Sequence, residues 1–171
     1  MTDTLYESFT ESPDNDVGIT ASLTYAQTFT PSVAHNITSV KLLLYRQGTP
    51  GTMYVEIRAT SAHYPTGSAL VTGSINANDF TTNSSGQLYE ITFPSALSLD
   101  ADTEYAIIAR CGGDAGNRPL WLWKTAGGYA GGFARGSMDN GASWYNQGGD
   151  LIFYEYGTAI SGNTSNFFHF F

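Results

Sequence analysis

Five aromatic side chains in the second half of the chain have the shape to bind a sugar ring, since a flat indole or phenol face packs well against apolar C–H groups. They are Trp121, Trp123, Tyr129, Trp144 and Tyr145. In residues 119–124, Leu120 and Leu122 alternate with the two tryptophans, so a strand here places the two kinds of side chain on opposite faces. With the leucines in the core, the tryptophans form an exposed platform. The alternative is that the glycine-rich run 126–132 folds over the tryptophans and makes them part of the core.

Catalytic and metal-binding patterns are weaker than this aromatic group. The histidines, His35, His63 and His169, are far apart, and no H-E-x-x-H or C-x-x-C pattern accompanies them, so a zinc site is not expected. The nucleophile motif G-x-S-x-G is absent. Carboxylate pairs for glycoside hydrolysis can be drawn from a set that any β-protein of this size offers, namely Glu56, Glu90, Glu104 and Asp150. The sequence therefore predicts a protein that is not an enzyme.

The acidic segment from Glu11 to Gly18 brings three carboxylates close together in the sequence, those of Glu11, Asp14 and Asp16. Because Ca²⁺ binds several oxygen ligands, a calcium loop is one interpretation of this segment. The spacing of an EF-hand is missing, and a solvated turn is the other interpretation. We therefore expect no cofactor, and a structural calcium is the one ion for which the sequence offers a candidate.

The run from Ser137 to Trp144, SMDNGASW, has the most regular pattern in the chain. Asp139 and Asn140 can hydrogen-bond to their own backbone and Gly141 supplies a positive φ, so the run predicts the turn of a β-hairpin. The spacing S-x-D-x-G-x-S-W resembles the Asp-box, a hairpin motif of sialidase-like propellers and of unrelated secreted or viral β-proteins. The resemblance implies a structural turn formed by Ser137, Asp139, Gly141 and Trp144. An ordinary polar turn is the alternative, and it gives Asp139 the same structural role.

Composition excludes several classes of partner. The 171 residues carry a formal net charge of −8, and the 7 basic residues are scattered along the chain. Nucleic acids and anionic membranes are bound by grouped Lys and Arg, so neither is expected as a partner. The first ten residues lack the basic start and apolar core of a secretory signal peptide, and no apolar run is long enough to span a membrane.

The single cysteine, Cys111, lies in an apolar run and is expected in the core.

Short alternating segments separated by turns occupy most of the chain. They predict an all-β fold, an antiparallel β-sandwich of jelly-roll type with about nine strands. Residues 37–45 and 52–58 alternate well and flank the turn sequence QGTPG at 47–51, which predicts that they form a hairpin. The alternation places Tyr54 on the outer face and the following residues inward: Val40, Leu42, Leu44, Met53, Val55 and Ile57. Residues 77–80 predict a turn or a single helical turn, and no longer segment has helical spacing.

The order of these segments resembles the jelly-roll module of choice-of-anchor-type surface proteins and of some phage structural proteins, and in outline that of jelly-roll carbohydrate-binding modules. The resemblance covers about residues 20–157. It rests on the sequence PTG at 65–67, the pattern L-x-x-x-T-x-Y from Leu99 to Tyr105, and the D-x-G-x-x-W turn. It implies a fold, and it brings no catalytic residues with it.

We expect residues 1–157 to form the domain and residues 158–171 to form a tail that is polar at first and aromatic at its end. The aromatic end consists of Phe167, Phe168, His169, Phe170 and Phe171. Exposed phenylalanines are unfavourable in water, so this end either packs on its own domain or docks on another chain.

The first functional hypothesis is a non-catalytic structural and interaction module, namely a phage virion accessory protein such as a capsid decoration or tail component. Such a protein docks on a protein partner, either a capsid or tail protein or a further copy of itself. It is made in the cytoplasm without a signal peptide and works on the virion or the extracellular surface. The alternative hypothesis is a carbohydrate-binding module that binds a glycan through an exposed Trp/Tyr face.

Overall fold

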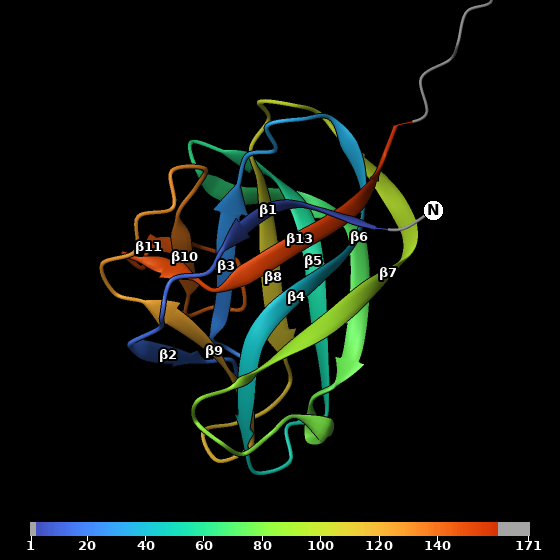
Figure 1. Ribbon diagram of the computed structural model, residues 1–171. Coiled ribbons are helices and arrows are strands. Elements are labelled where there is room, and N and C mark those ends of the chain that lie inside the picture. Colours follow the sequence, from blue (N-terminus) through green and yellow to red (C-terminus); the bar gives the residue numbers. More distant parts are fainter. Residues whose placement is uncertain (1–2, 161–171) are drawn as a thin grey trace, which may run out of the picture.

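The computed structural model describes residues 3–160, which form two antiparallel β-sheets packed face to face (Figure 1). The prediction of an antiparallel β-sandwich is confirmed at this level. The described residues contain thirteen strands where the alternation predicted about nine, and four of the thirteen have only two to four residues. The predicted helical turn at 77–80 is a 3₁₀ turn, η1 (Ala77–Asp79). No helix within residues 3–160 is long and apolar enough to cross a membrane.

Sheet A has seven strands and faces the viewer in Figure 1. They are β1 (Thr4–Phe9), β2 (Asn15–Gly18), β4 (His35–Gln47), β7 (Gln87–Leu99), β9 (Arg118–Lys124), β12 (Asp150–Leu151) and β13 (Phe153–Ala159). The long strand β4 is central, because β7, β9 and β13 all pair with it. β1 pairs with β13 at one edge, while β2 and β12 pair with β9. Strand β13 ends at Ala159, two residues beyond the predicted end of the domain.

Sheet B has six strands in the order β11-β10-β3-β8-β5-β6 and lies behind sheet A. They are β3 (Thr24–Phe29), β5 (Thr52–Ser61), β6 (Tyr64–Asn76), β8 (Tyr105–Cys111), β10 (Ala134–Ser137) and β11 (Tyr145–Asn146). The inner faces of the two sheets enclose the main core, to which both contribute alternate residues of their strands.

The predicted hairpin between residues 37–45 and 52–58 is wrong, because β4 belongs to sheet A and β5 to sheet B. The turn between them carries the chain from one sheet to the other, with Gly48 (φ 58°) and Gly51 (φ 81°) in left-handed conformations. Alternation records which side chains point inward, and this pattern is the same whether two strands pair or face each other across the core.

The inward residues themselves are as predicted. Alternate apolar side chains of β4 and β5 are fully buried: Val40, Leu42, Leu44, Met53, Val55 and Ile57. Cys111 at the end of β8 is buried too, and its thiol lies 3.3 Å from the carbonyl oxygen of Pro50. Burial raises the pKa of this thiol. Cys111 is therefore a core residue, as expected.

A buried polar link joins the two sheets where β3 meets β12. The amide nitrogen of Gln27 donates to the Asp150 carboxylate (3.0 Å), and the Gln27 amide oxygen accepts from the backbone N–H of Leu151 (2.8 Å). The second Asp150 oxygen accepts from the backbone N–H of Tyr129 (3.1 Å). Burial nevertheless raises the pKa of Asp150. Without these hydrogen bonds, the buried polar groups would lower the free energy of unfolding of the sandwich.

A second buried polar pair lies inside sheet A, where Nε2 of His35 is 2.7 Å from Oε1 of Glu155 and neither side chain is exposed. Nδ1 of His35 donates to the Val33 carbonyl (2.8 Å), and Tyr6 stacks on the imidazole with 3.7 Å between the ring centroids. Burial raises the pKa of Glu155. For His35, burial acts in the opposite direction, but the hydrogen bonds to Glu155 and Val33 outweigh it and the pKa is raised. The contact between Nε2 of His35 and Oε1 of Glu155 therefore joins β4 to β13 inside the sheet.

The buried pair should contribute far more to stability than a surface pair on the same strand. His35→Ala leaves Glu155 buried without its partner, so the free energy of unfolding should fall by about 3–5 kcal/mol. Lys41 on β4 forms a half-exposed pair with Glu90 (3.6 Å), and Lys41→Ala should cost less than about 1 kcal/mol. Urea unfolding of both variants measures the difference. Equal losses would contradict the assigned role of the His35–Glu155 pair.

Candidate functional site

The two tryptophans of β9 face the core, so the predicted exposed platform is wrong for Trp121 and Trp123. Trp121 has no exposed surface, and its indole N–H donates to the Ile152 carbonyl (2.8 Å). Trp123 is 6% exposed. The alternative interpretation, that these rings belong to the core, holds for both. The alternation correctly predicts that the leucines and tryptophans of β9 lie on opposite faces, but it does not show which face points inward, because both are apolar. The tryptophans point inward since their larger area gains more from burial.

The leucines of β9 consequently lie on the outer face of sheet A. Leu120 and Leu122 form a small apolar cluster there with Tyr45, and Leu43 packs against it. These side chains are buried although they lie outside the sandwich, because neighbouring segments lie over them. Gly86 in the loop before β7 is one such neighbour, since a Cβ at this position would lie 2.8 Å from the Leu122 side chain.

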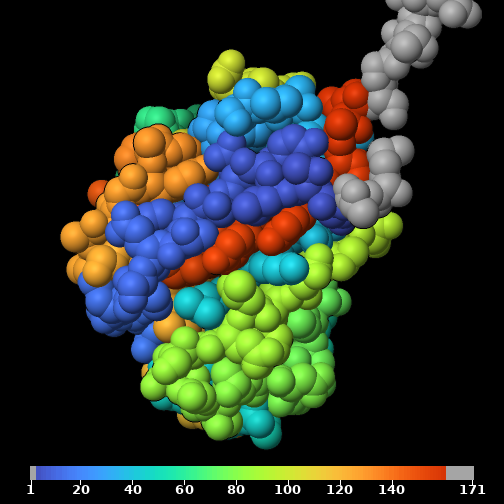
Figure 2. Space-filling model, viewed as in Figure 1, coloured from blue at the N-terminus to red at the C-terminus, as the bar shows by residue number. Residues whose placement is uncertain are grey.

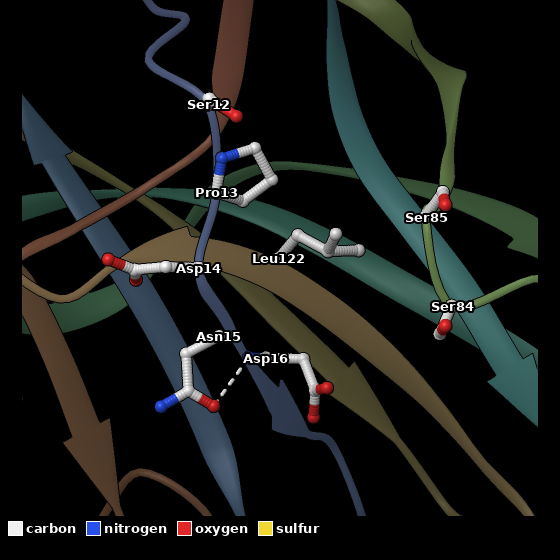
Figure 3. Close-up of a pocket in the computed structure, with 8 residues that line it drawn as sticks. All are labelled: Ser12, Pro13, Asp14, Asn15, Asp16, Ser84, Ser85 and Leu122. Carbon is white, nitrogen blue, oxygen red and sulfur yellow. Dashed lines mark hydrogen bonds between the residues drawn. The ribbon is translucent and has the colours of Figure 1, made fainter.

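An open groove of about 450 Å³ remains above this cluster. In Figure 2 it lies between the blue N-terminal segment and the green segment that precedes β7. The lining residues come from those two segments and from β9: Ser12, Pro13, Asp14, Asn15, Asp16, Ser84, Ser85 and Leu122. Figure 3 shows Pro13 and Leu122 between the segments, with Ser84 and Ser85 on the opposite wall and Asp14 pointing away from them.

The carboxylates of this groove are already bonded within the protein. Asp14 accepts from the backbone and hydroxyl of Thr125 (2.8 and 2.7 Å) and pairs with Lys124 (3.0 Å), and these contacts lower its pKa to about 2. Asp16 accepts the hydroxyl of Tyr45 (2.8 Å), whose pKa is raised to about 12 by burial and by this bond. No group of three or more potential metal ligands occurs within residues 3–160. Asp14 and Asp16, two of the three carboxylates in the candidate calcium loop, are thus engaged in structural contacts.

The run from Ser137 to Trp144 forms the turn of a hairpin between β10 and β11, as predicted. The Ser137 hydroxyl donates to Oδ1 of Asp139 (2.8 Å) and accepts the N–H of Gly141 (2.7 Å). Asp139 also accepts the N–H and hydroxyl of Ser143 (2.8 and 2.6 Å). These bonds lower the pKa of Asp139 to about 2, with the Ser143 hydroxyl as the largest cause. Asp139 therefore holds the turn.

The remaining three predicted sugar-binding aromatics are half-buried. Trp144 covers Ala26, Ala106 and Ile108 on the outer face of sheet B. Tyr145 lies against Gly136, where a Cβ would be 2.3 Å from its ring. Tyr129 packs against the main core and its hydroxyl donates to Glu7 (3.2 Å), and burial raises its pKa. Trp144 lies beside Gly141, which also adjoins Arg110 at a surface hollow.

That hollow has a volume of about 290 Å³ and lies on the outer face of sheet B. It is lined by Ala21, Tyr54, Arg110, Cys111, Gly112 and Asn140. Tyr54 on β5 and Arg110 on β8 are direct cross-strand neighbours, and Tyr54 is 49% exposed. Asn140 reaches the hollow from the Asp139 turn, which is tied down by the bond from the Asn140 N–H to the Ser22 carbonyl (2.9 Å). Sheet B thus places a ring, a guanidinium and an amide around one concavity.

The guanidinium of Arg110 is held in place by its neighbours. Nη1 donates to the backbone oxygen (2.6 Å) and the side-chain oxygen (2.8 Å) of Asn140. Nε lies 3.3 Å from Glu56, which also pairs with Arg58 (2.7 Å). A Cβ on Gly141 would lie 2.5 Å from Nη2 of Arg110 and 3.3 Å from the Trp144 ring, so glycine is required here for space as well as for its φ of 84°. The Asp139 turn therefore links Trp144 to the hollow.

The four carboxylates considered for glycoside hydrolysis have different partners. Glu56 pairs with two arginines, Glu90 accepts from Ser39 (2.7 Å), and Glu104 lies 2.9 Å from His63. Asp150 belongs to the link with Gln27. His169 and the docking segment Phe167–Phe171 lie outside the described residues.

The residues that sequence reasoning missed are Tyr54, Arg110 and Asn140 as a group. The alternation of 52–58 already placed Tyr54 on the outer face, which is correct. Arg110 lies in the apolar run 104–111, whose alternation predicts core residues and gives no indication of a surface site. The signal that would have found the pair is the antiparallel register of β5 and β8, and sequence alternation does not contain it.

The chain matches no protein-family model, and no curated protein matches it in sequence.

The stabilising role of Asp139 predicts a pH-dependent effect. Asp139→Asn should lower the melting temperature at pH 7 by about 2–4 °C, since hydrogen bonds to a carboxylate are replaced by weaker ones. A folded-state pKa near 2, below the ordinary value of 3.8, means that this stabilisation is present above about pH 4 and is lost as the pH falls toward 2. Thermal melts between pH 2 and pH 7 measure it. Met138→Ala in the same turn is the control, and a wild-type advantage that persisted at pH 2 would contradict the assignment.

Proposed function

We propose that this protein is a non-catalytic carbohydrate-binding module and that the hollow on sheet B is its ligand-contact site. The observation that carries the proposal is the cross-strand pair of Tyr54 and Arg110, with Asn140 beside it. A phenol ring offers an apolar face for sugar C–H groups, while a guanidinium and an amide hydrogen-bond to hydroxyls. Sugar recognition needs these two kinds of contact side by side.

The groove on sheet A supports this function less well. It has polar walls and an apolar floor, but no aromatic residue lines it, and its carboxylates already have partners. Its walls are formed largely by one N-terminal segment and one loop, whereas Tyr54 and Arg110 of the hollow stand on paired strands of sheet B. Side chains on paired strands are positioned more firmly than those on loops, which favours the hollow as a preorganised site.

The proposed architecture is a jelly roll, because the connections β3–β4, β4–β5, β6–β7 and β7–β8 each cross from one antiparallel sheet to the other, while β5 and β6 form a hairpin within sheet B. Within that fold we place the ligand surface on the outer face of sheet B. The earlier hypothesis of a virion accessory protein that docks through Phe167–Phe171 concerns residues outside the described part of the chain. It stays a prediction, and sugar binding at the hollow is compatible with it.

Binding to immobilised and soluble oligosaccharides tests the proposal. Tyr54→Ala should reduce affinity for the bound glycan by at least about tenfold, since it removes the stacking face without touching the core. Tyr156→Ala is the matched control, because Tyr156 lies on β13 in the opposite sheet and should leave affinity unchanged. A glycan array followed by titration calorimetry provides the measurement.

Two outcomes would contradict the proposal. The first is an absence of binding to every glycan class on the array at millimolar concentration. The second is binding that Tyr54→Ala leaves intact while Asp16→Asn abolishes it, because this would move the site to the groove on sheet A.

A further inference from the structure

The net charge of the residues that line the hollow on sheet B is opposite in sign to the net charge of the whole chain. Among the residues that line the hollow, Arg110 is the one that carries a charge. Glu56, which pairs with Arg110 and Arg58, and Asp139, whose oxygens accept from Ser137 and Ser143, lie outside this lining. The hollow is thus a local positive site on a chain whose net charge is −8.

The hollow also has hydrogen-bond donors that face no partner within residues 3–160. Nη1 of Arg110 donates to Asn140, Nε lies 3.3 Å from Glu56 without a hydrogen bond, and Nη2 makes no hydrogen bond among the described residues. Since a guanidinium can only donate, the Asn140 oxygen must be the atom that faces Nη1. The Asn140 amide nitrogen is then left to donate elsewhere. Nη2 of Arg110 and Nδ2 of Asn140 are two donors beside one positive charge.

From this arrangement we propose that the sheet B hollow selects sugars that carry a carboxylate, such as uronic acid residues, over neutral sugars. The proposal rests on the carbohydrate-binding function given above and names the ligand class of that same site. The ring of the sugar acid packs on Tyr54, and its carboxylate accepts from Arg110 and Asn140. Charge-assisted bonds from a guanidinium to a carboxylate are about twice as strong as neutral ones, which gives the selectivity its physical cause.

Electrostatics over longer distances would oppose this ligand, which makes the test more specific. A chain with a net charge of −8 repels a polyanion, so nonspecific attraction cannot produce the expected result. At physiological ionic strength charges are screened over about 8 Å, so the charged group nearest to the ligand dominates its electrostatic interaction with the protein. Binding of an acidic sugar must therefore come from local contacts at the positive hollow.

The experiment compares a galacturonic acid trisaccharide with its methyl ester, in which the same rings have lost their charge. Titration of the full chain should show that the acid binds at least about tenfold more tightly than the ester. Arg110→Gln should remove this difference, and Arg110→Lys should keep part of it because the charge remains without the planar fork. Added NaCl should weaken binding of the acid and leave binding of the ester nearly unchanged.

A gain-of-binding variant guards against loss through misfolding. Glu56→Gln removes the carboxylate that the two arginines share, so affinity for the acid should rise about threefold or more while affinity for the ester stays the same. A misfolded protein cannot produce this gain. Thermal melts of each variant show whether Arg110→Gln has kept its fold.

The outcomes separate the two proposals. If acid and ester bind equally and Tyr54→Ala weakens both, the carbohydrate-binding function stands and the selectivity for a carboxylate is wrong. If neither the acid, the ester nor any neutral glycan binds at millimolar concentration, both proposals are wrong. If the acid binds more tightly but Arg110→Gln, still folded, retains the preference, the assigned site is wrong.

Discussion

The burial of Trp121 between the two sheets is the constraint on which the rest of the structure depends. An indole of this size, with its N–H bonded to the Ile152 carbonyl, fixes which face of β9 points inward. The leucines of the same strand are then forced to the outside of sheet A, where the segments around Pro13 and Gly86 lie over them. The tryptophans of β9 are thereby removed from the outer face of sheet A. On sheet B, Tyr54 points away from the core and is 49% exposed, and we propose it as the stacking surface.

Much of the fold could be predicted from residue patterns. Which strands pair with each other, and which face of a strand points into the core, could not. Alternation identified the inward residues of β4 and β5, and the polar run ending in Trp144 identified its turn, because both are local properties. The partner of β4 is not local, since its neighbours β7, β9 and β13 are set by packing and loop paths. The face of β9 was ambiguous because both of its sides are apolar. The His35–Glu155 pair joins residues 120 positions apart, and no spacing rule detects it.

The structure also distinguishes polar residues that stabilise the fold from those that we propose to bind the ligand. Asp14, Asp139 and Asp150 each accept several hydrogen bonds within the protein, so the acidic character that drew attention in the sequence serves the fold. Arg110 is held by Asn140 and Glu56, yet it lines the hollow and its Nη2 makes no hydrogen bond among the described residues. The Asp139 turn connects the two roles, because the bonds that hold the turn also position Asn140 beside Arg110 and Trp144 beside Gly141. A stable turn thus preorganises the proposed site.

The most direct test of this account is a map of the binding surface by backbone amide chemical shifts during titration with the galacturonic acid trisaccharide. The account predicts concentration-dependent shifts at Tyr54, Arg110, Gly112 and Asn140, with little change at Asp16, Ser84 and Ser85 across the molecule. Shifts confined to the groove residues, or no shifts at millimolar ligand, would contradict the claim that the outer face of sheet B is the ligand surface.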